Sequence, residues 1–100
     1  MNGKKIIFID VDDTLVRTYG LKRIPIPKTI QAIIRFHKEG FEIYLWSNGG
    51  SDYCEKTAKE LGIDICITGF LPKPTLYIDD LPISDWKFCQ HIFPGQIDLV

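Results

Sequence analysis

The chain has 100 residues, enough for one compact domain and too few for two. Its hydrophobic content of 45% can supply a core, and its charged content of 25% is ordinary for a globular domain. A formal net charge of -1 gives no bulk attraction to nucleic acid or to an anionic membrane, so any binding to a polyanion would have to be local. We expect one domain over residues 1–100.

The cysteines and the apolar runs indicate the compartment. Three cysteines, an odd number with no CxxC pair, argue against a disulfide framework and for a reducing environment. The run Ile6–Ile9 is far too short for a signal sequence, and no segment approaches the roughly 20 apolar residues of a membrane helix. We therefore expect a soluble cytoplasmic protein with no membrane partner.

The first third of the chain predicts a strand, a loop and a helix. Lys4–Asp10 is expected to be a fully buried strand, because its apolar residues are continuous rather than alternating. Gly20 and two prolines break the segment Asp12–Pro27, which is predicted to be a loop. Lys28–Glu39 is predicted to be a helix ended by Gly40, and one face carries Ile30, Ile33, Ile34 and His37.

The rest of the chain continues this alternation. Ser51 or Asp52 is a candidate cap for a helix that ends near Leu61, with Cys54, Thr57, Ala58 and Leu61 facing inward. Alternation of Ile63, Ile65 and Ile67 with polar residues predicts a strand near a sheet edge. The remaining expected elements are strands at Phe41–Trp46, Thr75–Ile78 and Gln96–Val100 and a last helix from Ser84 to about Ile92.

Alternating strands and helices predict an α/β fold, a three-layer Rossmann-like parallel sheet with helices on both faces. In such sheets, ligands bind beyond the carboxyl ends of the strands. Polar residues follow three of the predicted strands, namely Asp10 with Asp12, Ser47, and Asp79 with Asp80. We therefore expect these side chains to converge on one edge of the sheet.

Asp10 and Asp12 are the most informative pair in the sequence. Side chains at i and i+2 of an extended segment point the same way, so both carboxylates can face one site. Two adjacent carboxylates repel each other, and a divalent cation between them offsets that repulsion. The pair therefore indicates a metal site with oxygen ligands.

These residues resemble the haloacid dehalogenase (HAD) superfamily of phosphohydrolases over about residues 4–85. The first motif of that family is DxDx[TV]L, the second is an apolar strand ending in Ser or Thr, the third is a Lys, and the fourth is an acidic pair after a strand. The matching residues, in the family's order, are Asp10-Val11-Asp12-Asp13-Thr14-Leu15, Ser47, Lys73, and Asp79-Asp80 with Asp85 further along.

The resemblance implies a reaction and a role for each residue. Asp10 would be the nucleophile that forms an aspartyl-phosphate, and Asp12 would be the general acid and then the general base. Ser47 would donate a hydrogen bond to a phosphoryl oxygen, and backbone N–H groups near Asn48 would add donors. Lys73 would neutralise the phosphoryl group and the Asp10 carboxylate. The expected enzyme is a phosphomonoester hydrolase.

Magnesium is the cofactor that the resemblance implies, because a hard site of oxygen ligands next to a phosphate suits it. Its expected ligands are Asp10, the backbone carbonyl of Asp12, and one of Asp79 and Asp80. Alignment with the family's Gly-Asp form makes Asp80 the direct ligand. Asp79 and Asp85 would then be ligands or partners through water.

The spacing between the motifs leaves no room for a cap domain, so the chain resembles a small capless member, a minimal HAD-like core. An open site suits a phosphorylated macromolecule, and it suits a small sugar-phosphate-like substrate if a neighbouring subunit supplies a lid. A homo-oligomer would also cover the apolar surface of so short a core. A phosphotransferase on the same core is an alternative that the sequence does not separate from a hydrolase. A non-enzymatic phosphoacceptor or binding domain is a further alternative, which the order of Lys73 before Asp79-Asp80 and the presence of Asp12 disfavour.

Overall fold

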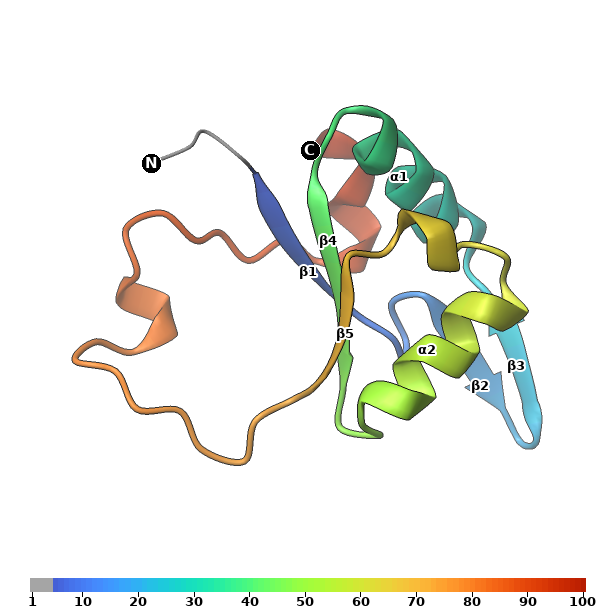
Figure 1. Ribbon diagram of the computed structural model, residues 1–100, viewed down its shortest axis with the longest axis horizontal. Helices are drawn as coiled ribbons and strands as arrows, with labels where there is room; N and C mark the ends of the chain where they lie inside the picture. The colour runs from blue at the N-terminus through green and yellow to red at the C-terminus, as the bar shows by residue number, and fades with distance from the viewer. Residues whose placement is uncertain (1–4) are drawn as a thin grey trace.

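A parallel sheet of three strands in the order β1-β4-β5 forms the centre of the computed structural model, which describes residues 5–100 (Figure 1). Helix α1 connects β1 to β4, and helix α2 connects β4 to β5. The strands pair in register, with Leu45 of β4 between Ile9 of β1 and Phe70 of β5. The elements are β1 (Ile6–Asp10), α1 (Pro27–Lys38), β4 (Glu42–Ser47), α2 (Ser51–Glu60) and β5 (Gly69–Pro72).

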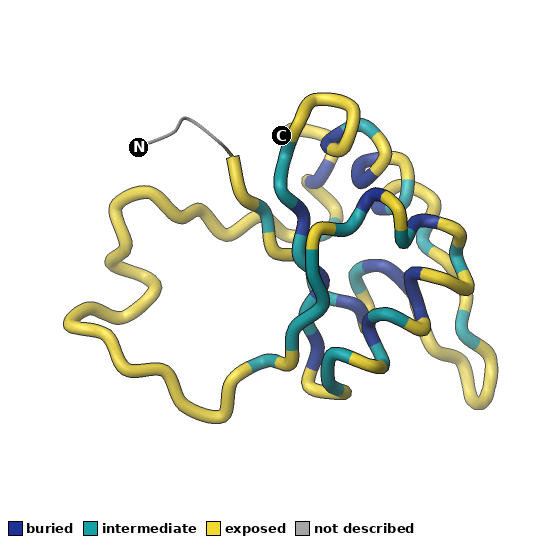
Figure 2. Tube along the Cα trace, viewed as in Figure 1, coloured by how far each residue is buried: buried dark blue, intermediate teal, exposed yellow. Residues whose placement is uncertain are grey.

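The core lies between one face of this sheet and the two helices. Both crossovers run in the same direction across the sheet, so right-handed connections place α1 and α2 on the same side of it (Figure 1). Figure 2 shows the buried residues gathered along β4 and the inner sides of both helices. The fully buried core side chains include Ile43 and Leu45 of β4, Ile33 and Phe36 of α1, and Cys54 and Ala58 of α2.

The opposite face of the sheet is only partly covered. Phe8 packs against Tyr44 and Trp46, at ring centroid distances of 5.2 and 5.1 Å, yet 46% of Phe8 and 60% of Ile6 remain exposed. The prediction of a fully buried first strand is therefore wrong, because only one face of β1 is buried. The expected α/β parallel sheet is confirmed, whereas helices on both faces are not seen within residues 5–100.

A β-hairpin replaces the loop expected between β1 and α1. Strand β2 (Val16–Tyr19) pairs antiparallel with β3 (Lys22–Pro25), and the two-residue turn between them begins with Gly20 at a φ of 60°. Glycine adopts this left-handed conformation without steric cost, and two-residue turns of this kind match the twist of a hairpin.

Helix α1 lies where the sequence predicts it, and its inward face is only partly the predicted one: Ile33 is buried and Ile30 packs against the core as expected. Thr29, Ala32 and Phe36 are buried together with Ile33, while Ile34 and His37 are exposed. Phe36 stacks on Phe41 at 4.9 Å, which orients the helix. The Thr29 hydroxyl donates a 2.6 Å hydrogen bond to the carbonyl of Thr14, so the start of α1 is attached to the turn after β1.

Helix α2 and its inward residues are as predicted, but Gly50 occupies the N-cap position that Ser51 or Asp52 was expected to fill. The strand expected at residues 63–67 is wrong. The segment Asp64–Cys66 is a 3-10 helix that buries Ile63 and Cys66 and leaves Ile65 82% exposed. The third strand of the sheet is instead β5, formed by residues that had no predicted strand. No helix among residues 5–100 has both the length and the apolar character needed to cross a membrane.

Residues 75–93 form an exposed segment that leaves the sheet and returns to it (Figures 1 and 2). The predicted strand Thr75–Ile78 and helix Ser84–Ile92 are absent, and only Ile83–Asp85 forms a 3-10 turn. Pro74 and Pro82 flank the apolar run, and proline cannot donate a hydrogen bond to a strand ladder. An apolar run becomes a strand only when it has a neighbour to pair with.

The C-terminal residues pack on α1. Pro94–Leu99 is a 3-10 helix rather than the expected strand, and Ile97 is buried. Lys28 forms a 3.2 Å ion pair with Asp98, and the Arg35 guanidinium donates a 3.0 Å hydrogen bond to the carbonyl of Val100. These contacts fix the C-terminal residues to α1.

Candidate functional site

Three strand ends bring Asp10, Ser47 and Lys73 together at the carboxyl edge of the sheet. Asp10 ends β1, Ser47 ends β4, and Lys73 directly follows β5. The backbone N–H of Lys73 donates a 2.9 Å hydrogen bond to the carbonyl of Ser47, which extends the β4–β5 pairing by one residue. The parallel register thus places these three predicted site residues at one edge.

The carboxylate of Asp10 has a partner on each oxygen. The Lys73 ammonium lies 3.0 Å from Oδ1, and the Thr14 hydroxyl donates a 3.2 Å hydrogen bond to Oδ2. The Lys73 amine also lies over the Trp46 ring, 5.6 Å from its centroid. Each side chain of the ion pair is about one third exposed, at 32% for Asp10 and 31% for Lys73, so the carboxylate is both held and accessible.

A tight turn after β1 directs Asp12 and Thr14 to the site. The Val11 carbonyl accepts hydrogen bonds from the N–H groups of Thr14, Leu15 and Val16 at 3.3, 2.8 and 3.1 Å. Asp13 has a φ of 63°, a left-handed conformation that aspartate adopts more readily than most side chains. The turn leaves Asp12 exposed and brings the Thr14 hydroxyl back to Asp10.

Asp12 is held by a residue that the sequence analysis did not single out. The Tyr53 hydroxyl, from the first turn of α2, donates a 2.6 Å hydrogen bond to Oδ1 of Asp12. Burial raises the pKa of the Tyr53 phenol, the hydrogen bond to Asp12 raises it further, and the nearby Arg23 charge lowers it in part. The phenol is therefore protonated near neutral pH and acts as a donor.

Ser47 and Asn48 differ in their access to a ligand. The Ser47 side chain is only 1% exposed, and its oxygen accepts a 3.0 Å hydrogen bond from the N–H of Gly49. Asn48 is exposed on the loop that leads into α2. Gly50, with a φ of 98°, completes this loop and precedes the first residue of the helix. Of the three predicted phosphate-binding residues, Ser47 is buried, the Lys73 side chain is about one third exposed, and Asn48 is exposed.

Asp79 and Asp80 are not brought to Asp10. Both lie in the exposed segment 75–93, and Asp79 Oδ1 accepts a 3.0 Å hydrogen bond from the N–H of Leu81 in a local turn. Within the part of the chain that the structure describes, no three His, Cys, Asp or Glu side chains cluster as a metal site. The expectation that Asp79 and Asp80 would follow a strand and meet Asp10 at one edge of the sheet is wrong, because residues 75–78 are not a strand.

A buried thiol lies beneath the acidic residues. Cys54 of α2 is fully buried, and its sulfur lies 3.7 Å from the carbonyl of Leu71. Burial raises the pKa of this thiol, and the negative charges of Asp10 and Asp12 add to the increase. The thiol is therefore neutral near pH 7 and serves as core packing rather than as a nucleophile.

Tyr53 is the residue of the candidate site that sequence reasoning missed, and the contact of Arg23 with it was not foreseen. Arg23 falls in the predicted loop, where a two-residue turn beginning with Gly20 was the available signal for a hairpin. Tyr53 lies in the first turn of a correctly predicted helix, directly after the loop that follows Ser47. A polar side chain at that position could have been expected to face the ends of the strands.

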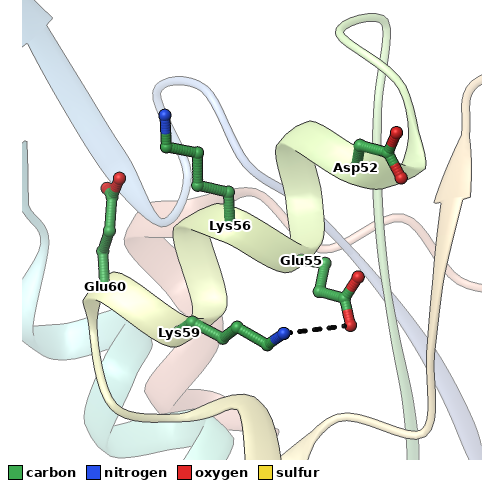
Figure 3. A pocket seen from close by; sticks show the side chains of 5 residues that line it. All are labelled: Asp52, Glu55, Lys56, Lys59 and Glu60. Carbon is green, nitrogen blue, oxygen red and sulfur yellow. Dashed lines mark ion pairs between the residues drawn. The ribbon is translucent and has the colours of Figure 1, made fainter.

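A separate hollow on the outer side of α2 is lined by charged side chains alone (Figure 3). Lys59 and Glu55 form a 3.6 Å ion pair one helical turn apart. The lining residues are Asp52, Glu55, Lys56, Lys59 and Glu60, whose charges largely balance. This surface resembles an ordinary solvated helix face and adds no reactive group to the site.

Comparison with protein-family models, with curated protein sequences and with solved structures found no match. The residues at the carboxyl edge of the sheet are therefore the basis for assigning a function.

Proposed function

We propose that this chain is a phosphomonoester hydrolase that works through an aspartyl-phosphate on Asp10, a minimal capless core of the HAD type. The observation that carries the proposal is the contact between Asp10 and Lys73 at 3.0 Å, with Asp12 held two residues further along the chain. A nucleophile, a charge-neutralising cation and an acid within reach of the leaving group are the groups that phosphoryl transfer requires.

In the first step, a carboxylate oxygen of Asp10 attacks phosphorus and the bond from phosphorus to the ester oxygen breaks. Asp12, in its protonated form, gives its proton to the departing oxygen, so the leaving group departs as a neutral alcohol. Lys73 balances the negative charge of the phosphoryl oxygens, which would otherwise repel the carboxylate nucleophile. Asp10 then carries the phosphoryl group.

In the second step, water attacks phosphorus and the bond between phosphorus and Asp10 breaks. Asp12, now a carboxylate, accepts a proton from the water, so inorganic phosphate leaves and both aspartates return to their starting forms. The hydrogen bond from Tyr53 to Asp12 supports turnover over long-term storage of the phosphoryl group, because it orients a dedicated base. The exposed Asn48 is the proposed donor to a phosphoryl oxygen, with Ser47 beneath it.

Magnesium is the proposed cofactor, and the residues at the sheet edge provide a small ligand set for it. The Asp10 carboxylate and the Asp12 carbonyl would hold the ion, which keeps several waters and commonly binds through one or two carboxylates and the substrate phosphate. When bound, it would neutralise charge on the phosphoryl oxygens. Asp79 and Asp80 are omitted from this set, since they lie in the exposed segment.

The exposure of Asp12 and Asn48 supports a phosphorylated group carried on a large molecule. A small sugar-phosphate-like substrate would leave much of its surface in water at such an open site, unless a second subunit covered it.

The test is phosphate release from 4-nitrophenyl phosphate, with magnesium and with a chelator. We expect magnesium-dependent turnover by the unmodified chain and only background release by Asp10→Asn, because the amide is a poor nucleophile. Asp79→Asn is the matched control, and it should keep full activity since its carboxylate makes a local turn. Stoichiometric labelling of Asp10 without turnover would instead indicate a phosphoacceptor, and faster product formation with added alcohols would indicate a phosphotransferase.

A further inference from the structure

We propose that Tyr53 is a positioning residue for Asp12, and that Arg23 of the hairpin holds Tyr53 in place. The inference rests on the proposed function, since it concerns how the general acid is oriented. It is carried by six contacts among residues from β3, α2 and the two loops at the carboxyl edge of the sheet.

The Tyr53 ring is fixed by its neighbours as well as by its hydroxyl. The Arg23 guanidinium lies 4.9 Å from the ring centroid. The ring also lies so close to Gly49 that a Cβ at that position would be 2.8 Å from Cδ2 of Tyr53. A side chain at residue 49 would therefore displace the ring, so the glycine is required for this packing.

Arg23 is itself anchored to α2. Its Nη1 forms a 3.0 Å ion pair with Glu60, and its Nη2 donates a 2.7 Å hydrogen bond to the Thr57 hydroxyl. That hydroxyl in turn donates a 2.9 Å hydrogen bond to the carbonyl of Tyr53. The Nε atom of Arg23 is the one buried side-chain polar atom without a partner among residues 5–100. Leaving it unpaired costs free energy, which the stacking and the two Nη contacts offset.

This network has a direct consequence for Asp12. An exposed aspartate on a turn would otherwise rotate freely about its side-chain bonds. The 2.6 Å hydrogen bond fixes Oδ1 and leaves Oδ2 as the oxygen that exchanges a proton with the leaving group. Proton transfer depends steeply on the position of the acid, and an error of about 1 Å can cost about 100-fold in rate.

The experiment compares two substrates of similar shape whose leaving groups differ in their need for a proton. Phenyl phosphate releases a more basic oxygen than 4-nitrophenyl phosphate, so its cleavage depends more on Asp12. Tyr53→Phe keeps the ring and removes only the hydroxyl. We expect kcat/KM for phenyl phosphate to fall about 10-fold or more, a part of the contribution of general acid catalysis, and kcat/KM for 4-nitrophenyl phosphate to fall about 3-fold or less.

Tyr44→Phe is the matched control. Tyr44 also donates a hydrogen bond to a carboxylate, Oε1 of Glu42 at 2.7 Å, but it lies on the opposite face of the sheet from α2. Tyr44→Phe should leave kcat/KM unchanged for both substrates. Asp12→Asn should give the full loss of kcat/KM, and that loss should again be larger for phenyl phosphate than for 4-nitrophenyl phosphate. Arg23→Gln keeps the phenol but removes the guanidinium that holds the ring. Its kcat/KM should also fall more for phenyl phosphate than for 4-nitrophenyl phosphate, by a smaller factor than in Tyr53→Phe.

The outcomes separate this inference from the proposed function. An inactive but folded wild type overturns both. Suppose that the wild type is active and that Asp12→Asn loses more kcat/KM on phenyl phosphate, but Tyr53→Phe does not. That result overturns the positioning role alone. An equal fall in kcat/KM on both substrates in Tyr53→Phe also overturns the positioning role, because a general structural defect affects both leaving groups alike. If circular dichroism shows that Tyr53→Phe is unfolded, Arg23→Gln decides in the same way.

Discussion

At the scale of single residues, Lys73 is held near Asp10 by contacts of its backbone and of its ammonium group. Its backbone N–H is fixed by the carbonyl of Ser47, and its ammonium lies over Trp46 and beside Asp10. The sequence indicated the residue through the order of the motifs, but the contact itself depends on β5, which the sequence did not predict. The identity of a site residue can thus be read from a motif before its position can.

Replacing Lys73 should affect activity far more than stability. We expect Lys73→Ala to lower kcat by about 10²–10³-fold, because the phosphoryl charge loses its nearest cation. The ion pair, with each side chain about one third exposed, should contribute less than about 1 kcal/mol to the free energy of unfolding. Steady-state kinetics and urea titration measure the two effects, and Lys73→Arg serves as the control that retains the charge. A stability loss with unchanged kcat would show that Lys73 is only structural.

At the scale of elements, periodicity and stop signals predicted α1, β4 and α2. They failed for the hairpin before α1 and for the segments after α2. The helices have apolar residues at helical spacing and a glycine after their ends, and β4 contains the apolar run Ile43–Trp46. The alternation of Ile63, Ile65 and Ile67 imitated a strand, although it is a 3-10 turn. The run Thr75–Ile78 has strand-like composition but no strand to pair with. Pairing depends on distant residues, and one sequence does not reveal it.

The two isoleucines around the 3-10 turn give a direct test of this assignment. Ile63 is buried and Ile65 is 82% exposed, whereas a strand with the predicted pattern would bury both. We expect Ile63→Ala to lower the free energy of unfolding by about 2–5 kcal/mol through loss of packing. Ile65→Ala should change it by less than about 0.5 kcal/mol. Chemical denaturation measures both, and equal losses would favour the strand.

At the scale of the whole molecule, apolar surface is unevenly distributed. The face of the sheet that packs against α1 and α2 is buried, while the other face leaves much of Ile6 and Phe8 exposed. Segment 75–93 adds further exposed apolar side chains, which are Leu76, Tyr77, Ile78, Leu81, Ile83, Trp86, Phe88, Ile92 and Phe93. Exposed apolar surface promotes association between molecules.

Polar substitutions in this segment should improve solubility without weakening the fold. We expect the double variant Ile78→Ser and Phe88→Ser to change the free energy of unfolding by less than about 0.5 kcal/mol, because 99% of Ile78 and 83% of Phe88 is exposed. Phe36→Ala, in the core, should cost about 3–5 kcal/mol under the same conditions. Light scattering and denaturant titration measure the two properties. A loss above about 2 kcal/mol in the double variant would mean that the segment is packed.

The attachment of the C-terminal residues to α1 has a consequence for how the chain can be divided. Ile97 is buried against the domain, and contacts from Lys28 and Arg35 reach Asp98 and Val100. Since this end is held by side chains and not only by the backbone that leads to it, a break between Thr75 and Phe93 need not release it. The exposed segment is therefore the natural place to cut the protein into two fragments that reassemble, or to insert a second domain.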